Sequence, residues 1–246
     1  MRLADGVEML EINAEFMGRQ TIIYPVVISD ENDVVLVDTG FPESDGITQI
    51  RRQMTEAGIP FERLSRVIIT HQDLDHIGGL PELVRQAAHK PEILSHAEEK
   101  PSLDGTKKLI KFTSRARAEF QSMPEAQQNQ LRPIYENPPR TPVDRTLSDG
   151  EELPYGGGLV VIHTAGHTPG HICLYLKSSK ILITGDAMNI VNNKLTGPNP
   201  HYTKDLDTAK ASLKKLLQYD IREVVCYHGG RYADNVSQRI AHLAAE

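Results

Sequence analysis

The stretch "THQDLDHIGG", Thr70 to Gly79, places two histidines and two aspartates within the six positions from His71 to His76. It directly follows the apolar run "RVIIT" (66–70), which is typical of a short buried strand. The next stretch, "GLPELVRQAAH" (79–89), has Pro81 near the first turn of an expected helix. The four side chains are therefore predicted to lie in a loop between a strand and a helix, where polar groups can converge on a site.

Three further loops carry side chains of the same kinds, each directly after a strand-like run. They are "TAGHTPGH" (164–171), "ITGD" (183–186) and "VVCYHGG" (224–230). Imidazole and carboxylate are the ligand types that hold divalent first-row metals, and seven of them suit two adjacent ions better than one tetrahedral ion. The candidate ligands are His71, Asp73, Asp75, His76, His167, Asp186 and His228. His171, at the start of "HICLYL", is expected to pack near the site rather than to bind metal.

The rest of the chain alternates strands and helices, which favours a layered α/β fold. "TIIYPVVI" (21–28) and "DVVLVD" (33–38) are predicted as consecutive strands, and "DGITQIRRQMTEAGI" (45–59) as a helix with Asp45 at its N-cap and Gly58 closing it. Residues 101–142 change character and are interpreted as a helical insertion over the site rather than a linker. Its basic run "KKLIKFTSRAR" (107–117) is interpreted as a solvated helix face, with contact to an anionic substrate as the alternative. We expect one domain over residues 1–246.

Composition limits the partners. The formal net charge of -6 argues against nucleic acid as a partner. The N-terminus does not resemble a signal peptide, and no apolar run has the length of a membrane span, so we expect a cytoplasmic protein without a membrane partner. Cys173 and Cys226 each lie inside an apolar run and are expected as small core residues. A small-molecule substrate is expected; the oligomeric state stays open, with a homodimer as one alternative.

From "VLVDTG" through "THQDLDHIGG", "TAGHTPGH", "LITGD" and "CYHGG", the sequence resembles the metallo-β-lactamase-fold hydrolases, which include lactonases and glyoxalase II. The resemblance implies a four-layer αββα sandwich. It also implies that His71, Asp73 and His167 bind one metal, that Asp75, His76 and His228 bind the other, and that Asp186 bridges them. Asp38 in "VLVDTG" resembles the family's buried acid behind a ligand, with a turn-capping residue as the equal alternative.

Asp73 departs from the family pattern His-x-His-x-Asp-His, because that position usually carries histidine. With Asp75 and Asp186 it brings three negative charges to two divalent ions, so one bridging hydroxide would make the cluster neutral. The extra oxygen ligand should shift the preference from zinc toward manganese or iron, although zinc remains the first expectation. A carboxylate that only hydrogen-bonds a ligand histidine is the alternative role for Asp73.

The resemblance implies metal-assisted hydrolysis of a small carbonyl ester, with a lactone as the first substrate class. Asp75 would orient the nucleophile or accept its proton, and Tyr202 could donate to the leaving group or oxyanion; a packed loop aromatic is the alternative for Tyr202. Two other functions stay open. One is a di-iron redox protein related to flavodiiron proteins, and the other is a mononuclear or non-catalytic relative.

Overall fold

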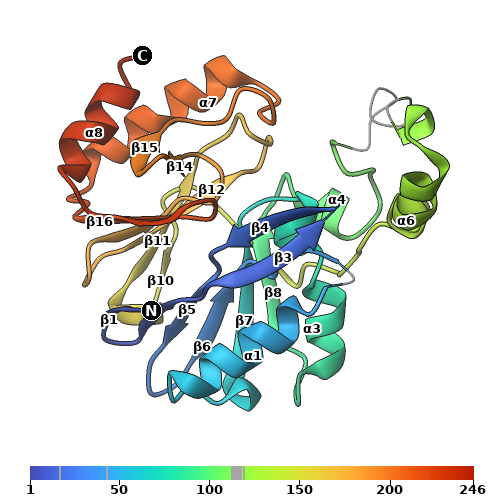
Figure 1. The fold of residues 1–246 in the computed structure, drawn as a ribbon. Helices are drawn as coiled ribbons and strands as arrows, with labels where there is room; N and C mark the ends of the chain where they lie inside the picture. Colours follow the sequence, from blue (N-terminus) through green and yellow to red (C-terminus); the bar gives the residue numbers. More distant parts are fainter. Residues whose placement is uncertain (17, 43, 112–117, 119) are drawn as a thin grey trace.

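The structure, a computed structural model, describes residues 1–16, 18–42, 44–111, 118 and 120–246. Two mixed β-sheets pack face to face, with helices covering the outer face of each (Figure 1). The larger sheet has seven strands in the order β1-β2-β5-β6-β7-β8-β9, and the smaller has six in the order β10-β11-β12-β13-β16-β17. This arrangement confirms the predicted four-layer αββα sandwich.

The bounds of the elements follow the chain. The seven-stranded sheet comprises β1 (Arg2–Ala4), β2 (Val7–Met9), β5 (Val26–Ser29), β6 (Val34–Val37), β7 (Leu64–Ile69), β8 (Glu92–His96) and β9 (Arg145–Leu147). The six-stranded sheet comprises β10 (Glu152–Leu153), β11 (Leu159–His163), β12 (Ile172–Leu176), β13 (Ile181–Ile183), β16 (Glu223–Cys226) and β17 (Gly230–Tyr232). Two hairpins lie outside both sheets: β3 (Ile12–Phe16) with β4 (Arg19–Ile23), and β14 (Asn189–Val191) with β15 (Lys194–Thr196). The helices are α1 (Gly46–Glu56), α2 (Leu74–Ile77), α3 (Leu80–Gln86), α4 (Lys100–Leu103), α6 (Glu125–Glu136), α7 (Leu206–Ser212) and α8 (Val236–Leu243), with 3-10 turns η1 (Phe61–Arg63), η2 (Tyr155–Gly157) and η3 (Leu213–Gln218).

The central strands are apolar at every position because both of their faces are buried. In β6, Val34 and Leu36 face the cluster under α1 and α3, whereas Val35 and Val37 face the cluster between the two sheets. All four side chains are at most 1% exposed. A continuous apolar run such as "VVLV" therefore arises because the strand contacts one hydrophobic core on each face, as expected for the middle of a layered fold.

Amphipathic helices close the two outer cores. Ile47, Ile50 and Met54 of α1 pack into the cluster on the larger sheet, together with Leu80 and Leu83 of α3. On the smaller sheet, η3 and α8 supply the corresponding apolar residues: Leu213, Leu216, Val236, Ile240 and Leu243. None of the helices within the described ranges combines the length and the apolar character needed to cross a membrane.

One local prediction was wrong, and the two predicted ends of α1 were right in position. "TIIYPVVI" is not one strand, because Pro25 separates β4, in a hairpin, from β5, in the larger sheet. Proline has no N–H to donate and commonly ends strand pairing in this way. Asp45 occupies the N-cap position of α1, but its side chain makes no capping bond and instead accepts a hydrogen bond of 2.8 Å from Gln49 Nε2. Gly58 follows the helix with φ +75°, as predicted for the residue that closes it.

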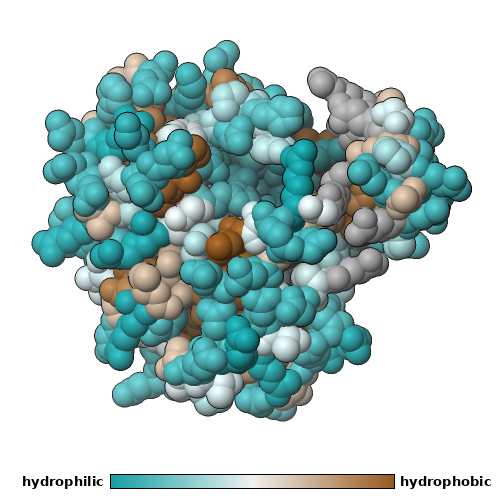
Figure 2. Space-filling view, in the orientation of Figure 1, coloured by the Kyte–Doolittle hydropathy of each residue, from teal (hydrophilic) through white to brown (hydrophobic). Residues whose placement is uncertain are grey.

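The predicted insertion is only partly helical in the described residues. Helices α4 and α6 lie within or at the border of residues 101–142, and α6 carries its own small core of Leu131 and Ile134 packed with Phe120. Residues 112–117 and 119, which include the end of the predicted basic helix, lie outside the described residues. Figure 2 shows a hollow beside the part of the surface around α7, bordered mostly by hydrophilic residues.

Candidate metal centre

The candidate ligands come from loops at one edge of the two packed sheets. The "THQDLDHIGG" loop leaves the end of β7, and its residues Leu74–Ile77 form the short helix α2, so that Asp75 and His76 lie on a helical turn. His167 lies between β11 and β12. Strands β13 and β16 are parallel neighbours, so the residues that follow them, Asp186 and His228, emerge at the same edge.

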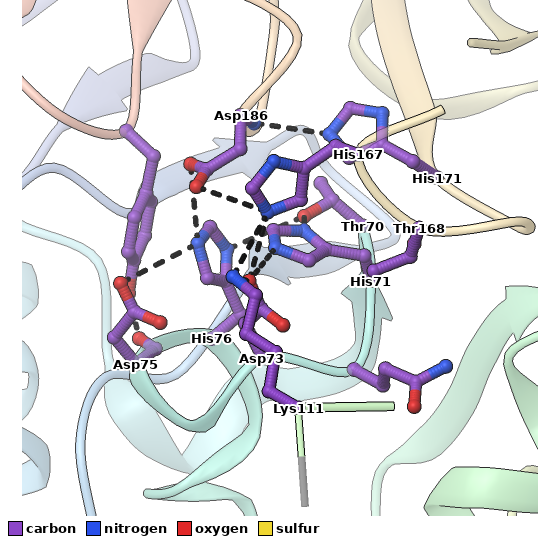
Figure 3. Close-up of polar contacts among 12 residues, drawn as sticks. Thr70, His71, Asp73, Asp75, His76, Lys111, His167, Thr168, His171 and Asp186 are labelled. Atoms are coloured by element: carbon purple, nitrogen blue, oxygen red, sulfur yellow. Dashed lines mark hydrogen bonds and ion pairs between the residues drawn. The ribbon is translucent and has the colours of Figure 1, made fainter. Parts of the chain in front are cut away.

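One set of four ligand candidates, which we call the Asp73 group, consists of His71, Asp73, His167 and Asp186. One ligand atom from each lies within 4.8 Å of the others, and all four residues are buried. Asp73 Oδ2 is 2.8 Å from His167 Nε2 and 3.2 Å from His71 Nε2. Asp186 Oδ2 is 3.4 Å from His167 Nε2. The atoms thus surround a space of the size that a metal ion takes among such ligands (Figure 3).

A second set, the Asp75 group, consists of Asp75, His76 and His228. His228 Nε2 is 3.0 Å from Asp75 Oδ2, and His76 Nε2 is 3.8 Å from the same oxygen. Asp186 connects the two groups, because its other oxygen, Oδ1, lies 3.4 Å from His76 Nε2 and 3.5 Å from His228 Nε2. One carboxylate therefore turns one oxygen toward each group.

Three buried polar atoms in these groups lack a hydrogen-bond partner among the described residues. They are His71 Nε2, His76 Nε2 and Asp186 Oδ1. Buried polar atoms are nearly always paired, and leaving one unpaired costs about 1–3 kcal/mol, so three together point to a missing partner. Imidazole nitrogens and a carboxylate oxygen are the donor atoms that zinc, iron and manganese accept. The residues therefore fit a metal ion.

The charges around the groups also favour a cation. Burial lowers the pKa of His71 to about 4, assisted by the nearby His76, so the His71 ring is neutral and can offer a lone pair. For His76, burial is outweighed by the carboxylates of Asp38, Asp75 and Asp186, which raise its pKa well above the ordinary value. These carboxylates stabilise positive charge at this point, whether a proton or a metal ion supplies it.

Asp38 holds the loop and one of its histidines in place. Its carboxylate accepts hydrogen bonds from Thr70 N at 2.9 Å, Thr70 Oγ1 at 2.8 Å and His76 Nδ1 at 2.8 Å. The last contact fixes the proton of His76 on Nδ1 and directs Nε2 toward the Asp75 group. Asp38 is thus a buried acid in contact with His76, a candidate ligand, and its φ of 61° shows that it also forms the turn after β6, so features of both predictions are present.

His171 packs behind the site, as predicted. Its Nε2 accepts a hydrogen bond of 3.0 Å from the backbone N of Asp186, and its Nδ1 lies 2.8 Å from Thr164 Oγ1. Both ring nitrogens are thus engaged away from the two groups. His171 positions Asp186 and is not one of the ligand candidates.

Sequence reasoning missed Glu99, which is fully buried at the start of α4. Its Oε1 accepts from Thr168 Oγ1 at 2.6 Å and Gly170 N at 2.7 Å, and its Oε2 accepts from Gln72 N at 3.1 Å and Gln72 Nε2 at 2.7 Å. Glu99 therefore ties the loop of His71 and Asp73 to the loop of His167. Nothing in "SHAEEK" distinguishes it from its exposed neighbour Glu98, so no sequence signal was available.

Sequence reasoning also missed Lys111, which was part of the run interpreted as a solvated helix face. Lys107 and Lys108 are exposed, as that interpretation requires. Lys111 instead donates to Asp73 Oδ2, and its Nζ is 3.4 Å from His167 Nε2. Burial raises the pKa of Asp73, but the interactions with His71 and Lys111 outweigh it and hold the pKa well below the ordinary value.

The structure places Tyr202 at the border of the site. Its ring centroid is 5.5 Å from Lys111 Nζ, and 52% of the residue is exposed. Tyr202 is therefore a largely exposed residue and not a packed loop aromatic. A second tyrosine, Tyr227, is buried against the ring of His76 with 3.9 Å between ring centroids, and its hydroxyl donates to the backbone oxygen of Asp75 at 2.5 Å.

Known proteins are similar to this chain in sequence or in fold. The chain is 28% identical over 217 residues to "Probable metallo-hydrolase YflN" of Bacillus subtilis, covering 82% of this chain and 77% of that protein. It is 30% identical over 196 residues to human "Acyl-coenzyme A thioesterase MBLAC2", covering 76% of this chain but only 64% of that protein. A metallo-beta-lactamase family protein from Thermus thermophilus has the same fold, with a TM-score of 0.74 at 24% identity over 99% of this chain and 80% of that one.

The family pattern spans both sheets and all four ligand-bearing loops. The model of the metallo-beta-lactamase superfamily matches residues 18–228, a range that begins before β4 and ends on the last candidate ligand. Because the match covers most of the chain and the αββα fold agrees with it, this protein belongs to the metallo-β-lactamase superfamily.

Proposed function

We propose that this protein is a metal-dependent hydrolase that uses two divalent ions to cleave a small carbonyl ester, with a lactone as the first substrate class to test. The observation that carries the proposal is the set of three buried atoms that lack a hydrogen-bond partner among the described residues: His71 Nε2 in the Asp73 group, His76 Nε2 in the Asp75 group, and Oδ1 of Asp186, which connects the two groups. The two relatives compared above are named as a probable metallo-hydrolase and an acyl-coenzyme A thioesterase, which supports a hydrolase.

The ligands in this proposal are the Asp73 group for one ion and the Asp75 group for the other. Asp186 would serve both ions, because its two oxygens face different groups. Zinc is the first candidate. Manganese and iron are the next candidates, because Asp73 contributes a hard carboxylate oxygen where a histidine nitrogen is usual.

Ions bound here would polarise the substrate carbonyl and lower the pKa of a coordinated water toward neutrality. The side chain of Asp75 is 18% exposed, more than those of Asp73 and Asp186, so it is the carboxylate best placed to meet water and substrate. We assign it the task of orienting the nucleophile and accepting its proton. Tyr202, accessible at the border of the site, would donate its hydroxyl proton to the leaving group or the developing oxyanion.

A thioester is the second substrate class, and one specific observation favours it. The 30% identical human relative is named an acyl-coenzyme A thioesterase. This chain spans only 64% of that protein, so the parts that select its substrate can lie outside the shared region. Oxygen ester and thioester cleavage need the same electrophile activation and differ in the leaving group, so one centre can serve either.

Two alternatives remain as outcomes of the test. A di-iron redox protein would contain iron and hydrolyse neither ester class. A mononuclear or non-catalytic relative would hold one ion and show no turnover.

The proposal also includes a small-molecule substrate, a cytoplasmic location, no nucleic-acid or membrane partner, and a single domain over residues 1–246. Cys173 and Cys226 are buried and form no disulfide, which supports a reducing compartment.

The test measures metal content by mass spectrometry on protein purified without added metal, for the wild type and Asp73→Ala. Asp5→Ala, which removes an exposed carboxylate far from both groups in sequence, is the control. We expect about two ions in the wild type and Asp5→Ala, and about one in Asp73→Ala. One ion in all three would remove Asp73 from the ligand set.

Activity is measured on the same proteins with two substrates, a γ-lactone followed by acid release and an acyl-coenzyme A followed by thiol release. Asp75→Asn should lower kcat on the active substrate by about two to four orders of magnitude, the range typical of a lost general base. Tyr202→Phe tests the hydroxyl alone. No metal-dependent turnover on either substrate would contradict the proposed reaction.

A further inference from the structure

Lys111 enters the Asp73 group from the segment that follows α4. Its ammonium donates to Asp73 Oδ2 and lies 3.4 Å from His167 Nε2 (Figure 3). Asp73 Oδ2 is also the oxygen that faces His71 Nε2 at 3.2 Å and His167 Nε2 at 2.8 Å. The lysine therefore occupies the same oxygen and the same histidine nitrogen that a metal in this group would need.

Hydrogen bonds of neighbouring residues hold the segment that carries Lys111 close to the Asp73 group. The backbone N of the preceding residue, Ile110, donates to Gln72 Oε1 at 2.7 Å. Gln72 Nε2 in turn donates to the buried Glu99 at 2.7 Å. The backbone beside Lys111 is thus fastened to the residue next to Asp73, so it stays near the group while these hydrogen bonds persist, and the ammonium can leave Asp73 only by a movement of the side chain.

The charges of the site balance when one divalent ion is bound and Lys111 stays in place. Asp73, Asp75 and Asp186 carry three negative charges, which one divalent ion and the Lys111 ammonium match together. Addition of a second divalent ion while the ammonium stays would place two cations on Asp73, at a separation where like charges repel strongly in a partly buried site. The ammonium must then leave Asp73 before the second ion can bind.

We propose that Lys111 is an internal cation that competes with the metal for the Asp73 group. The first ion fills the Asp75 group with Lys111 in place, and the second binds only as the Lys111 side chain withdraws from Asp73. Lys111 thereby sets the affinity of the second site and the metal concentration at which the protein becomes dinuclear. This inference rests on the proposed metal centre.

The test is a zinc titration of metal-free protein against a competing chelator of known affinity. Lys111→Met removes the ammonium but keeps a flexible apolar chain, and Lys111→Arg keeps a positive charge. Lys107→Met, an exposed lysine of the same segment, is the matched control. Far-ultraviolet circular dichroism of each metal-free variant verifies the fold, and the number of bound ions is counted separately by mass spectrometry.

We expect one tight and one weaker zinc site in the wild type, in Lys107→Met and in Lys111→Arg. In Lys111→Met the weaker site should tighten by about tenfold or more, because a competing charge near the ion is gone. If Lys111→Met and the wild type both bind two ions with the same affinities, or if Lys111→Arg tightens the site equally, competition by Lys111 is refuted while the metal centre stands. If none of the proteins binds zinc, manganese or iron, the proposed function itself fails.

Discussion

Glu99 joins the loop of His71 and Asp73 to the loop of His167, and its hydrogen bonds allow the cost of replacing it to be estimated. Each of its oxygens accepts two hydrogen bonds, Oε1 from Thr168 and Gly170 and Oε2 from Gln72. In Glu99→Gln one oxygen becomes an amide nitrogen that cannot accept, so two of the four bonds are lost whichever way the amide is oriented. At about 1.5–3 kcal/mol for each bond to a charged acceptor, the gross loss is about 3–6 kcal/mol.

Part of that loss is offset, because the substitution also removes a buried charge. Burial raises the pKa of Glu99 above the ordinary value even though four donors contact it, which shows that ionisation here carries a desolvation cost. We therefore expect Glu99→Gln to lower the free energy of unfolding of metal-free protein by about 3 kcal/mol. For a chain of this size that corresponds to a fall in Tm of about 6–12 °C.

Thermal unfolding followed by circular dichroism measures this effect, with chelator present so that metal binding does not contribute. Glu98→Gln is the matched control, because the neighbouring carboxylate is exposed. Its Tm should stay within about 2 °C of the wild type, since exposed substitutions rarely exceed about 0.5 kcal/mol. Equal Tm values for Glu99→Gln and Glu98→Gln would refute the idea that Glu99 joins the two ligand loops.

Three other expectations follow from the contacts of the site. Asp38→Asn should weaken zinc binding at the Asp75 group by about 10- to 100-fold, because His76 loses the partner of its Nδ1; an unchanged affinity in a chelator-competition titration would contradict this. Removing metal should lower Tm by about 5–11 °C relative to protein in a free metal-ion concentration of about 100 times the dissociation constant of that ion. Adding back zinc, manganese or iron in differential scanning calorimetry then ranks the three ions by the Tm that each restores. Gly79→Ala should destabilise the fold by about 2–3 kcal/mol in urea unfolding, because a Cβ there would lie 2.2 Å from the backbone oxygen of Thr39; Gly150→Ala, with φ +75° but open space around it, should cost only about 1–2 kcal/mol.

The sequence allowed a layered α/β fold and the seven candidate ligands to be predicted because both leave local patterns, whereas the four-layer sandwich was implied by the resemblance to the metallo-β-lactamase-fold hydrolases. Continuous apolar runs such as Val34 to Val37 reflect burial on two faces, and ligand-type residues placed directly after such runs fall at the sheet edge. The break at Pro25 was missed for a related reason. An apolar run reports burial, but it does not report whether the strand changes its hydrogen-bonding partners along its length.

The residues that hold the site could not be predicted, because their roles depend on contacts between distant parts of the chain. Glu99 and Lys111 lie 27 and 38 residues from their partners Gln72 and Asp73. In sequence they are ordinary charged residues among other charged residues. Only the fold makes one of them a buried clamp and the other a cation inside the Asp73 group.

The loop from Thr70 to Gly79 combines the two kinds of residue in alternation. His71 and Asp73 face the candidate metal centre, whereas Thr70 and Gln72 bind the buried acids Asp38 and Glu99. Thr70 and Gln72 alternate with His71 and Asp73, so the same four residues both present candidate ligands and fasten the loop. Because Gln72 also accepts from Ile110, the fastening extends to the segment that carries Lys111. Asp73 and the lysine that contacts it are therefore held by one connected set of hydrogen bonds. A substitution of Asp73 is expected to alter the position of Lys111, and a substitution of Lys111 that of Asp73.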